Sequence, residues 1–393
     1  ATDVGTVAAV VTDDKGQAIP AKVEFISGDQ QQTPDWGPES AEFFVGNLAY
    51  TADGKFEVPL RAGSYDVIVS HGPEYDAVFT TVDIAKGNVT ALNAVLRRSV
   101  HTPGWISADF HSHSTPSGDN TGSQLGRVLN LAAEHVEFAP CTEHNRISTY
   151  EDHISSLGLQ PYIATVSGME LTGRPGELNH QNSFPLIRHP RTQDGGGPQR
   201  DRDPQVQVER LASWDDDSEK LIQQNHPDIG WLFFDVNGDG KSDAGFERIH
   251  KKIDVMEVHP IDHILNLQRF SIRDGKPSGN QRMFNWLQLL NQGFRVFGIV
   301  NTDAHYNLHG SGGLRNWIQS STDHPAQIDP EEIRRASERG RLIMSNGPYL
   351  ATHVQEKGGS DSFVSGQDMT ATSGEVTVHV EVQCPNWIDA VSY

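Results

Sequence analysis

The chain has 393 residues, which at about one domain per 150 residues predicts two to three domains with several hydrophobic cores. It carries 31 Lys and Arg against 52 Asp and Glu, and the resulting formal charge of −21 would repel nucleic-acid phosphates and anionic lipids. We therefore expect neither a nucleic-acid partner nor a membrane partner.

Residues 1–98 predict a small antiparallel β-sandwich. Short segments of alternating apolar residues occur at 7–11, 21–26, 55–60 and 65–69. Turn signals at residues 13–16 and at Asp53-Gly54 separate them. Short strands at this spacing are typical of a sandwich. We predict no catalytic residue in this domain.

Residues 99–348 change to a rhythm of strand, loop and helix. Strands are predicted at 105–110, 136–141, 161–168, 220–224, 253–258 and 294–300. Helices are predicted after Ser123, which is suited to an N-cap, and at 203–212, 281–290 and 329–340. Alternating β and α units with apolar strands indicate a parallel sheet, either open or closed into a barrel.

Residues 349–393 return to a β pattern. A strand is predicted at 375–382, where apolar and polar residues alternate. We expect a third, β-rich domain here, a second sandwich that is small or truncated, because the pattern stops in mid-strand.

Histidines and carboxylates recur where the predicted central strands end. These residues are His111, His113, Glu143, His144, Glu170, His180, His226, Asp303 and His305. A single histidine after a strand is usually a loop residue or a hydrogen-bonded one. Because the carboxyl ends of strands in a β/α fold lie on one face, recurrence at consecutive strand ends predicts a metal cluster instead.

The kinds of ligand narrow the choice of metal. Imidazole and carboxylate groups without thiolates suit Zn, Mn or Fe better than an all-oxygen Ca or Mg cage. There are more ligands than the three or four that one ion takes. We therefore expect two to three divalent ions with a bridging carboxylate, and such clusters activate water and clamp the oxygens of a displacement.

The order of the motifs resembles a known superfamily. The segments "DFHSHSTPSGDN", "CTEHN", "GMEL", "NHQNSFPL", "QQNHP" and "NTDAHY" resemble the polymerase and histidinol phosphatase (PHP) superfamily of metal-dependent hydrolases. The form "HQNSFPL" and the leading sandwich resemble its carbaryl-hydrolase-like branch. The segments "DDKGQAIPAKVEF" and "TADGKFEVPLRAGSYDVIV" resemble a carboxypeptidase-regulatory-like sandwich. The resemblance covers about residues 100 to 350 and implies a distorted seven-stranded β/α barrel with up to three metals.

The resemblance also implies a ligand set for each ion. The first ion would take His111, His113, Glu170 and Asp303; the second Glu170, His180 and His226; the third Asp119, His144 and His305. This chain departs from the family at two positions. Glu143 stands where many relatives have Asp, and Asp119 stands where the family often has His, so the third set differs most from the family pattern.

Four residues are predicted to take part in the reaction itself. Glu170 and Asp303 would do so as ligands. Arg146, two residues after His144, is predicted to bind a substrate anion, with a surface or ion-paired arginine as the alternative. Arg174 and Arg188 are weaker candidates for the same role. His259 is predicted to line the cleft.

A separate motif indicates a calcium loop. Oxygen-bearing side chains occupy positions 1, 3, 5 and 9 of a nine-residue segment that has Gly at position 6. The loop residues are Asp235, Asn237, Asp239, Lys241 and Asp243. Position 12 is Phe246, so the motif resembles the calcium loops of integrin-like repeats rather than an EF-hand. An Asx-rich turn is the alternative.

The leading functional hypothesis is a metal-dependent hydrolase that acts on a small molecule. A hydroxide on the cluster would attack a phosphoester or a carboxyl or carbamate ester. The alternative is a secreted calcium-binding adhesion or binding protein with a non-catalytic barrel. Low lysine content, acidity, the sandwich and the calcium motif favour a periplasmic or secreted protein. The chain begins without a charged and apolar leader, so we expect a signal peptide to be absent or removed.

Overall fold

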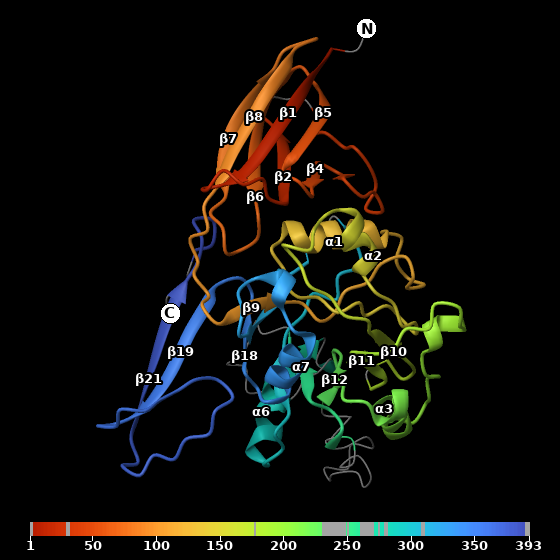
Figure 1. The fold of residues 1–393 in the computed structure, drawn as a ribbon, viewed down its shortest axis with the longest axis vertical. Helices are drawn as coiled ribbons and strands as arrows, with labels where there is room; N and C mark the ends of the chain where they lie inside the picture. The colour runs from red at the N-terminus through yellow and green to blue at the C-terminus, as the bar shows by residue number, and fades with distance from the viewer. Residues whose placement is uncertain are drawn as a thin grey trace.

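The computed structural model describes residues 3–28, 32–176, 178–229, 249, 251–259, 271–273, 276–278, 282–307 and 311–389. Figure 1 shows an all-β part at the N-terminus, a mixed part of strands and helices below it, and a ribbon of long strands beside the mixed part. The predicted calcium loop from Asp235 to Asp243 lies outside the described residues. Within the described residues, no helix is both long and apolar enough to span a bilayer.

The N-terminal part consists of two sheets that share one core. Its strands are β1 (Val4–Asp13), β2 (Ala21–Ser27), β3 (Phe44–Val45), β4 (Leu48–Thr51), β5 (Lys55–Arg61), β6 (Gly63–Ser70), β7 (Val78–Ile84) and β8 (Val89–Leu96). One sheet has the order β5-β1-β8 and the other β3-β4-β2-β6-β7. Alternate residues of both sheets, such as Val7, Val23 and Val67, are buried in the same hydrophobic cluster, as expected for a period of two.

One pairing differs from the predicted antiparallel arrangement. β1 and β8 run parallel, with Thr6 opposite Val89. The chain passes through β6 and β7 of the other sheet between β5 and β8, and this crossing allows β8 to enter from the same end as β1. The turn before β5 requires glycine, because Gly54 has φ +74° and a Cβ there would lie 2.3 Å from the carbonyl oxygen of Val11.

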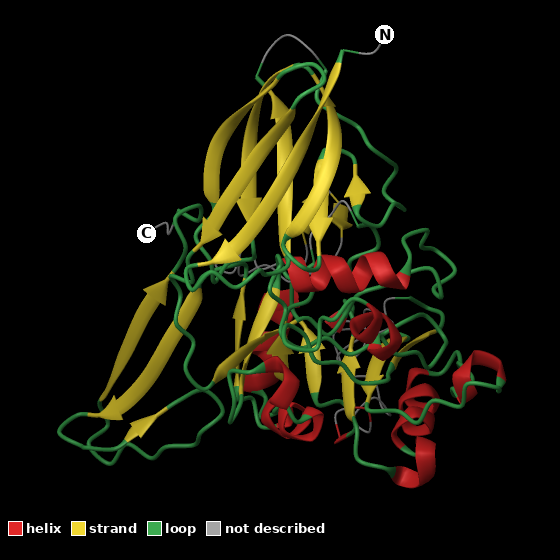
Figure 2. Cartoon of the chain, turned by 45° about the horizontal axis from the view of Figure 1, so that its top comes forward, coloured by secondary structure: helices red, strands yellow, loops and turns green. Residues whose placement is uncertain are grey.

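The central part holds three more sheets, the smallest of them the pair β14-β15, with helices packed around the sheets (Figure 2). Its strands are β9 (Trp105–Ala108), β10 (Met169–Thr172), β11 (His180–Phe184), β12 (Leu221–Gln224), β13 (Val255–Glu257), β14 (Ser271–Arg273), β15 (Lys276–Ser278), β16 (Phe297–Ile299), β17 (Arg315–Gln319) and β18 (Leu342–Ser345). Its α-helices are α1 (Gln124–Ala133), α2 (Glu151–Ser156), α3 (Pro204–Ala212), α4 (Trp214–Asp217), α6 (Arg282–Asn291) and α7 (Pro330–Glu338). As predicted, Ser123 caps α1 by accepting a hydrogen bond from the backbone N of Gly126.

The two larger central sheets have the orders β10-β11-β12-β13-β16 and β18-β17-β9. The predicted all-parallel sheet is wrong in part, because β11 runs antiparallel to both β10 and β12. The described residues between β10 and β11 form no helix, and a short connection without a helix favours antiparallel neighbours. The pairs β12–β13 and β13–β16 are parallel, as the β/α pattern predicts.

The strand predicted at 136–141 is not a regular strand in the structure. Phe138 makes only single bridges, to Ala108 and to Ala164, and Ser112 makes one to Ala304. Pro140 has no N–H to donate to a ladder. The strand predicted at 161–168 is shifted to β10, so Glu170 lies within a strand rather than after one. Among the described residues the regular ladders do not close into a ring, and the seven-stranded barrel stays a prediction.

The C-terminal part is one antiparallel sheet of the order β20-β19-β21. Its strands are β19 (Tyr349–Glu356), β20 (Ser362–Phe363) and β21 (Val376–Gln383). β21 coincides with the strand predicted at 375–382, and most of its residues on both faces are exposed to solvent. The described residues show a single sheet here rather than a second sandwich.

A buried carboxyl group near the start of β13 makes stability depend on pH. Asp254 Oδ2 accepts a hydrogen bond from the backbone N of Ile222 at 2.8 Å. Burial raises the pKa of Asp254 to about 7, and the negative charge of Glu338 adds to this effect. Because the unfolded side chain ionises near pH 4, folding becomes progressively less favourable between about pH 4 and 7.

We therefore expect Asp254→Asn to stabilise the protein above neutral pH. The amide oxygen can still accept the Ile222 hydrogen bond, and no charge is buried. The variant should be more stable than the wild type by about 1–3 kcal/mol at pH 8, and the difference should shrink toward pH 4. Denaturant unfolding at both pH values measures this difference in stability. A variant that is less stable than the wild type at pH 8 would contradict the raised pKa of Asp254.

Candidate metal centre

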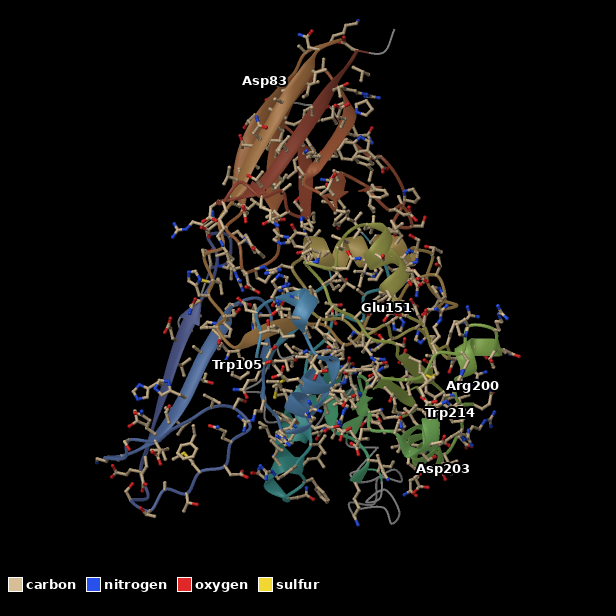
Figure 3. All side chains as sticks on the ribbon, viewed as in Figure 1. Asp83, Trp105, Glu151, Arg200, Asp203 and Trp214 are labelled. Carbon is tan, nitrogen blue, oxygen red and sulfur yellow. The ribbon has the colours of Figure 1, made fainter. Side chains whose placement is uncertain are left out.

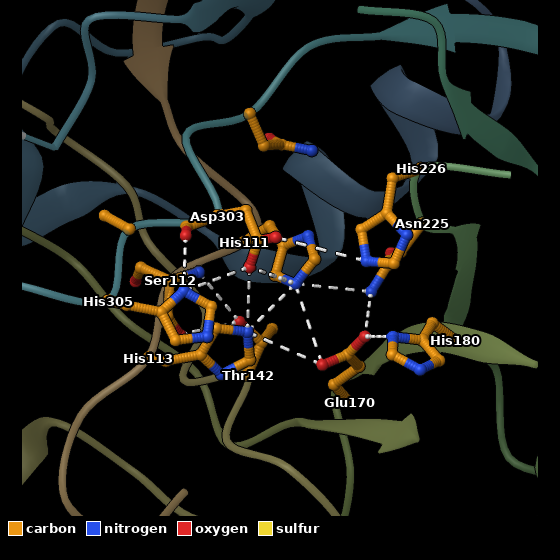
Figure 4. A network of polar contacts seen from close by, with 12 residues as sticks. His111, Ser112, His113, Thr142, Glu170, His180, Asn225, His226, Asp303 and His305 are labelled. Atoms are coloured by element: carbon orange, nitrogen blue, oxygen red, sulfur yellow. Dashed lines mark hydrogen bonds and ion pairs between the residues drawn. The ribbon is translucent and has the colours of Figure 1, made fainter. Parts of the chain in front are cut away.

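The structure brings all nine predicted metal ligands together. Figure 4 labels all of them except Asp119 and His144. Their donor atoms form four groups that share members, and the atoms within each group lie within 4.8 Å of one another. The groups are His111, His113 and Glu170; His111, His226 and Asp303; Glu170, His180 and His226; and His113, His144 and His305. Asp119 joins the last group through its carboxylate. Glu170 and His180 belong to β10 and β11, His144 forms a single bridge with Glu170, and the other six ligands lie in loops and turns.

Glu170 lies at the middle of this metal centre and is fully buried. Its Oε1 lies 3.0 Å from Nδ1 of His180 and accepts a hydrogen bond of 3.0 Å from Nδ2 of Asn225. Its Oε2 lies 2.5 Å from Nδ1 of His144 and 3.5 Å from Nε2 of His113. The two oxygens therefore face different histidines, which is the arrangement of a carboxylate that bridges two ions.

Three donor atoms of the first ligand set converge on one point. Nε2 of His111 and Nε2 of His113 lie 3.0 Å apart. Asp303 Oδ1 lies 3.2 Å from the former and 3.1 Å from the latter. This oxygen and Glu170 Oε2 are buried, and both face histidine nitrogens of the centre. Three lone-pair-bearing atoms that converge on one point fit a bound cation.

The third set is the most open. Asp119 Oδ2 lies 3.0 Å from Nε2 of His144 and 3.3 Å from Nε2 of His305. The Asp119 side chain is 55% exposed, whereas Glu170 is buried. The shorter aspartate therefore still reaches both histidines, although it stands where the family often has a histidine, and it does so from the solvent side of the centre.

The pKa values of two carboxyl groups in the centre are consistent with a site that binds cations. Burial opposes ionisation of Glu170, but hydrogen bonds with His111 and His144 outweigh burial and hold its pKa well below the usual range. Asp303 has a lowered pKa for a similar reason, because His111 and His113 face it. Both carboxylates are therefore ionised and available as ligands at neutral pH.

Sequence reasoning missed Glu257, which positions two ligands. It is fully buried. Its Oε1 accepts a hydrogen bond of 2.8 Å from Nδ1 of His111, and its Oε2 accepts one of 2.7 Å from the backbone N of His226. Burial raises its pKa, but the charge of His111 outweighs burial and brings the pKa to about 2. Glu257 ends β13, so the strand-end criterion that found the other ligands could have found it.

Two further buried residues hold the ligand loops. Glu143 accepts hydrogen bonds from the backbone N of Ser114 at 3.0 Å and from Oγ of Ser117 at 2.6 Å, which fixes the loop after His113. Arg127 donates to the carbonyl oxygens of His113 and Ala304, at 3.0 and 3.1 Å. The hydrogen-bond partners of both residues are distant in sequence. The sequence contains no signal that identifies Arg127 as a residue that holds the ligand loops.

Arg146 and His259 lie at the edge of this arrangement. The Arg146 side chain is 49% exposed, and its Nη2 lies 3.9 Å from Asp194 Oδ1. His259 is largely buried, with Nε2 3.7 Å from Oε2 of Glu257. In the described part of the chain, neither side chain forms a hydrogen bond or ion pair with the nine ligands. Their predicted roles in the reaction stay predictions.

A pocket of about 990 Å³ adjoins the second ligand set. His180 and His226 line it, together with four arginines: Arg174, Arg200, Arg202 and Arg282. Arg282 is held by its own hydrogen bonds to the carbonyl oxygens of His226 and His259, at 3.0 and 2.6 Å. The other three arginines are exposed, and Figure 3 places Arg200 at the periphery of the central part.

No family model and no curated protein matches this chain. Among solved structures, it is similar to a two-domain protein from Bacteroides vulgatus whose description names a predicted PHP-like metal-dependent phosphoesterase, with 15% identity and a TM-score of 0.40. That match covers 63% of this chain and 66% of the other. It is also similar to a streptococcal ancillary pilin, with 17% identity, a TM-score of 0.19 and coverage of 29% and 37%. A third match is the TIE protein of Bacillus anthracis, with 15% identity, a TM-score of 0.19 and coverage of 30% and 20%.

Proposed function

We propose that the protein is a metal-dependent hydrolase of PHP type that cleaves phosphoesters of small molecules. The observation that carries this proposal is the pocket in which His180 and His226 of the metal centre meet four arginines. The sequence motifs of the PHP resemblance support it, because each ligand that they imply lies in the centre.

Some residues of the centre would bind the ions, and others orient the ligands. Divalent ions held there would supply Lewis acidity and activate water for attack on the substrate. Glu170 and Asp303 supply the charge that holds such ions. Glu257 fixes the ring of His111 through Nδ1 and so directs Nε2 toward the centre. Hydrogen bonds from Glu257, Glu143 and Arg127 hold the ligand loops in this geometry.

The arginines favour an anionic substrate over a neutral ester. The protein has a formal charge of −21, so a phosphate dianion would be repelled by most of its surface. Four guanidinium groups around one pocket reverse that local sign and can bind phosphate oxygens in pairs. A neutral carboxyl or carbamate ester would have no use for them.

Replacing two of these arginines should separate the substrate classes. We expect Arg200→Ala/Arg202→Ala to raise the KM for an aryl phosphate by about tenfold, because charged hydrogen bonds at an exposed rim contribute about 1–2 kcal/mol. Hydrolysis of an aryl acetate or carbamate should change much less. Steady-state kinetics on both substrates with Zn²⁺ or Mn²⁺ measures the difference.

Two single variants complete this experiment. Arg188 is exposed and lies outside the arginine-lined pocket, so Arg188→Ala serves as the matched control and should leave both activities unchanged. Arg146→Ala tests the anion-binding role predicted from sequence. Equal losses on phosphate and neutral ester would contradict the phosphoester proposal, and no hydrolysis of either with ions bound would favour a binding protein.

An exported location stays a prediction.

A further inference from the structure

A second cluster of metal-ligating side chains lies where the N-terminal part meets the central part. Glu74 comes from the segment between β6 and β7, and His135 and Glu137 follow α1. One donor atom from each of the three lies within 4.8 Å of the others, and all three residues are buried. None of them belongs to the nine ligands of the metal centre. Glu137 begins the same stretch of chain that later reaches His144 of the metal centre.

One carboxylate oxygen of each glutamate in this cluster accepts hydrogen bonds from neighbouring residues. Glu74 Oε2 accepts a hydrogen bond from Nε of Arg98 at 2.8 Å. Glu137 Oε2 accepts hydrogen bonds from the backbone N and the Oγ of Ser107, at 2.7 and 3.2 Å. These contacts fix both carboxylates from behind, as second-shell partners do around bound metals.

The inner atoms are not satisfied. Oε1 of Glu74 and both ring nitrogens of His135 are buried without a hydrogen-bond partner among the described residues. The distance from His135 Nε2 to Glu74 Oε1 is 3.6 Å, too long for a hydrogen bond. A buried polar atom without a partner costs about 1–3 kcal/mol. Glu74 Oε1 and His135 Nε2 face each other across 3.6 Å, so a group bound between them would satisfy both.

The ring of His135 is held in place by its neighbours rather than by hydrogen bonds. The ring of His71 stacks on it with centroids 4.8 Å apart, and the ring of Tyr75 packs edge-on at 5.2 Å. His71 Nδ1 instead contacts the carbonyl oxygen of Ala133 at 3.2 Å. The nitrogens of His135 are therefore oriented but free to bind a ligand.

We propose that Glu74, His135 and Glu137 bind a divalent transition-metal ion, Zn²⁺ first, which joins the N-terminal part to the central part. One imidazole and two carboxylates form a donor set that Zn²⁺ accepts. Donors of one tetrahedral Zn²⁺ lie about 3.4 Å apart, close to the 3.6 Å between His135 Nε2 and Glu74 Oε1. The ion is structural, because its ligands are buried and lie outside the arginine-lined pocket.

The test compares His135→Gln with the wild type, both as full chains equilibrated with Zn²⁺ alone. The variant should contain one Zn²⁺ fewer per chain by elemental analysis. Its melting temperature should be lower by about 5 °C or more in Zn²⁺, and the difference should largely disappear in EDTA. His71→Gln is the control, because His71 packs on the same ring but is not in the donor set, and its zinc content should be unchanged.

Equal zinc content in wild type and His135→Gln would overturn the proposal. Should the variant not fold, anomalous diffraction from wild-type crystals at the zinc edge replaces it. A peak within about 2.2 Å of Glu74 Oε1 and a His135 nitrogen supports the site. Water density or empty space there, with ions present in the metal centre, overturns it.

Discussion

Glu170→Gln should lower the rate of hydrolysis by at least about a thousandfold while the protein stays folded. The substitution keeps the size and shape of the side chain but removes the charge that faces His144 on one side and His180 on the other. One oxygen also becomes an amide nitrogen, which cannot bind a metal ion. Loss of an ion that activates water costs several kcal/mol of transition-state stabilisation, and each 1.4 kcal/mol is about tenfold in rate.

The measurements are kcat and KM for an aryl phosphate, metal content, and the melting temperature of the same preparation. Glu151→Gln is the matched control, because Glu151 is an exposed residue of the first turn of α2, and it should hydrolyse like the wild type. Near-normal turnover by Glu170→Gln would show that the reaction takes place elsewhere. A folded variant with reduced metal content and no activity agrees with a bridging role.

The sequence was sufficient to predict which ligands gather, because strand ends are local signals. Apolar runs place the ends of β12 and β16, and His226 and Asp303 follow them directly. The parallel pairing of β12, β13 and β16 then brings these ends together. This reasoning found eight of the nine ligands without any knowledge of contacts between side chains, whereas Asp119 came from the resemblance to the PHP superfamily.

The supporting residues could not be predicted in the same way. Arg127 is an ordinary residue of an amphipathic helix in the sequence, yet it is fully buried and ties two ligand loops together. The direction of β11 depends on a connection whose conformation the apolar pattern does not encode. The pocket arginines come from the segments after β10 and before α3 and from α6, which only the folded chain brings together. Long-range packing decides all three features.

Asp303 and His226 add a feature that only backbone geometry reveals. Their φ angles are +50° and +25°, in a region that residues other than glycine rarely occupy. Such conformations persist where surrounding contacts over-determine them, and they gather at functional sites. Here Glu257 holds the backbone N of His226, and the backbone N of Asp303 donates to the carbonyl oxygen of His111 at 2.9 Å.

Removal of the metal ions should abolish hydrolysis and lower the melting temperature by roughly 10 °C or more. Each bound ion stabilises the fold by about 3–4 kcal/mol when its concentration is 100 to 1,000 times its Kd, and a chain of this size loses about 2–4 °C per kcal/mol. Without ions, the negative charges of Glu170 and Asp303 repel each other across the centre. Dialysis against a chelator, followed by calorimetry and by assays after return of Zn²⁺, Mn²⁺ or Fe²⁺, measures both effects.

The number of ions distinguishes the metal centre from the site proposed at His135. In the His135→Gln background, elemental analysis should find two to three ions per chain, all of them in the centre. Because Glu170 belongs to both the first and the second ligand sets, Glu170→Gln in that background should lose more than one ion rather than one. Fewer than one ion per chain in His135→Gln after metal supplementation, or an unchanged melting curve in chelator, would contradict the cluster. Loss of a single ion on Glu170→Gln would instead show that the two sets bind independently and that Glu170 is not the bridge.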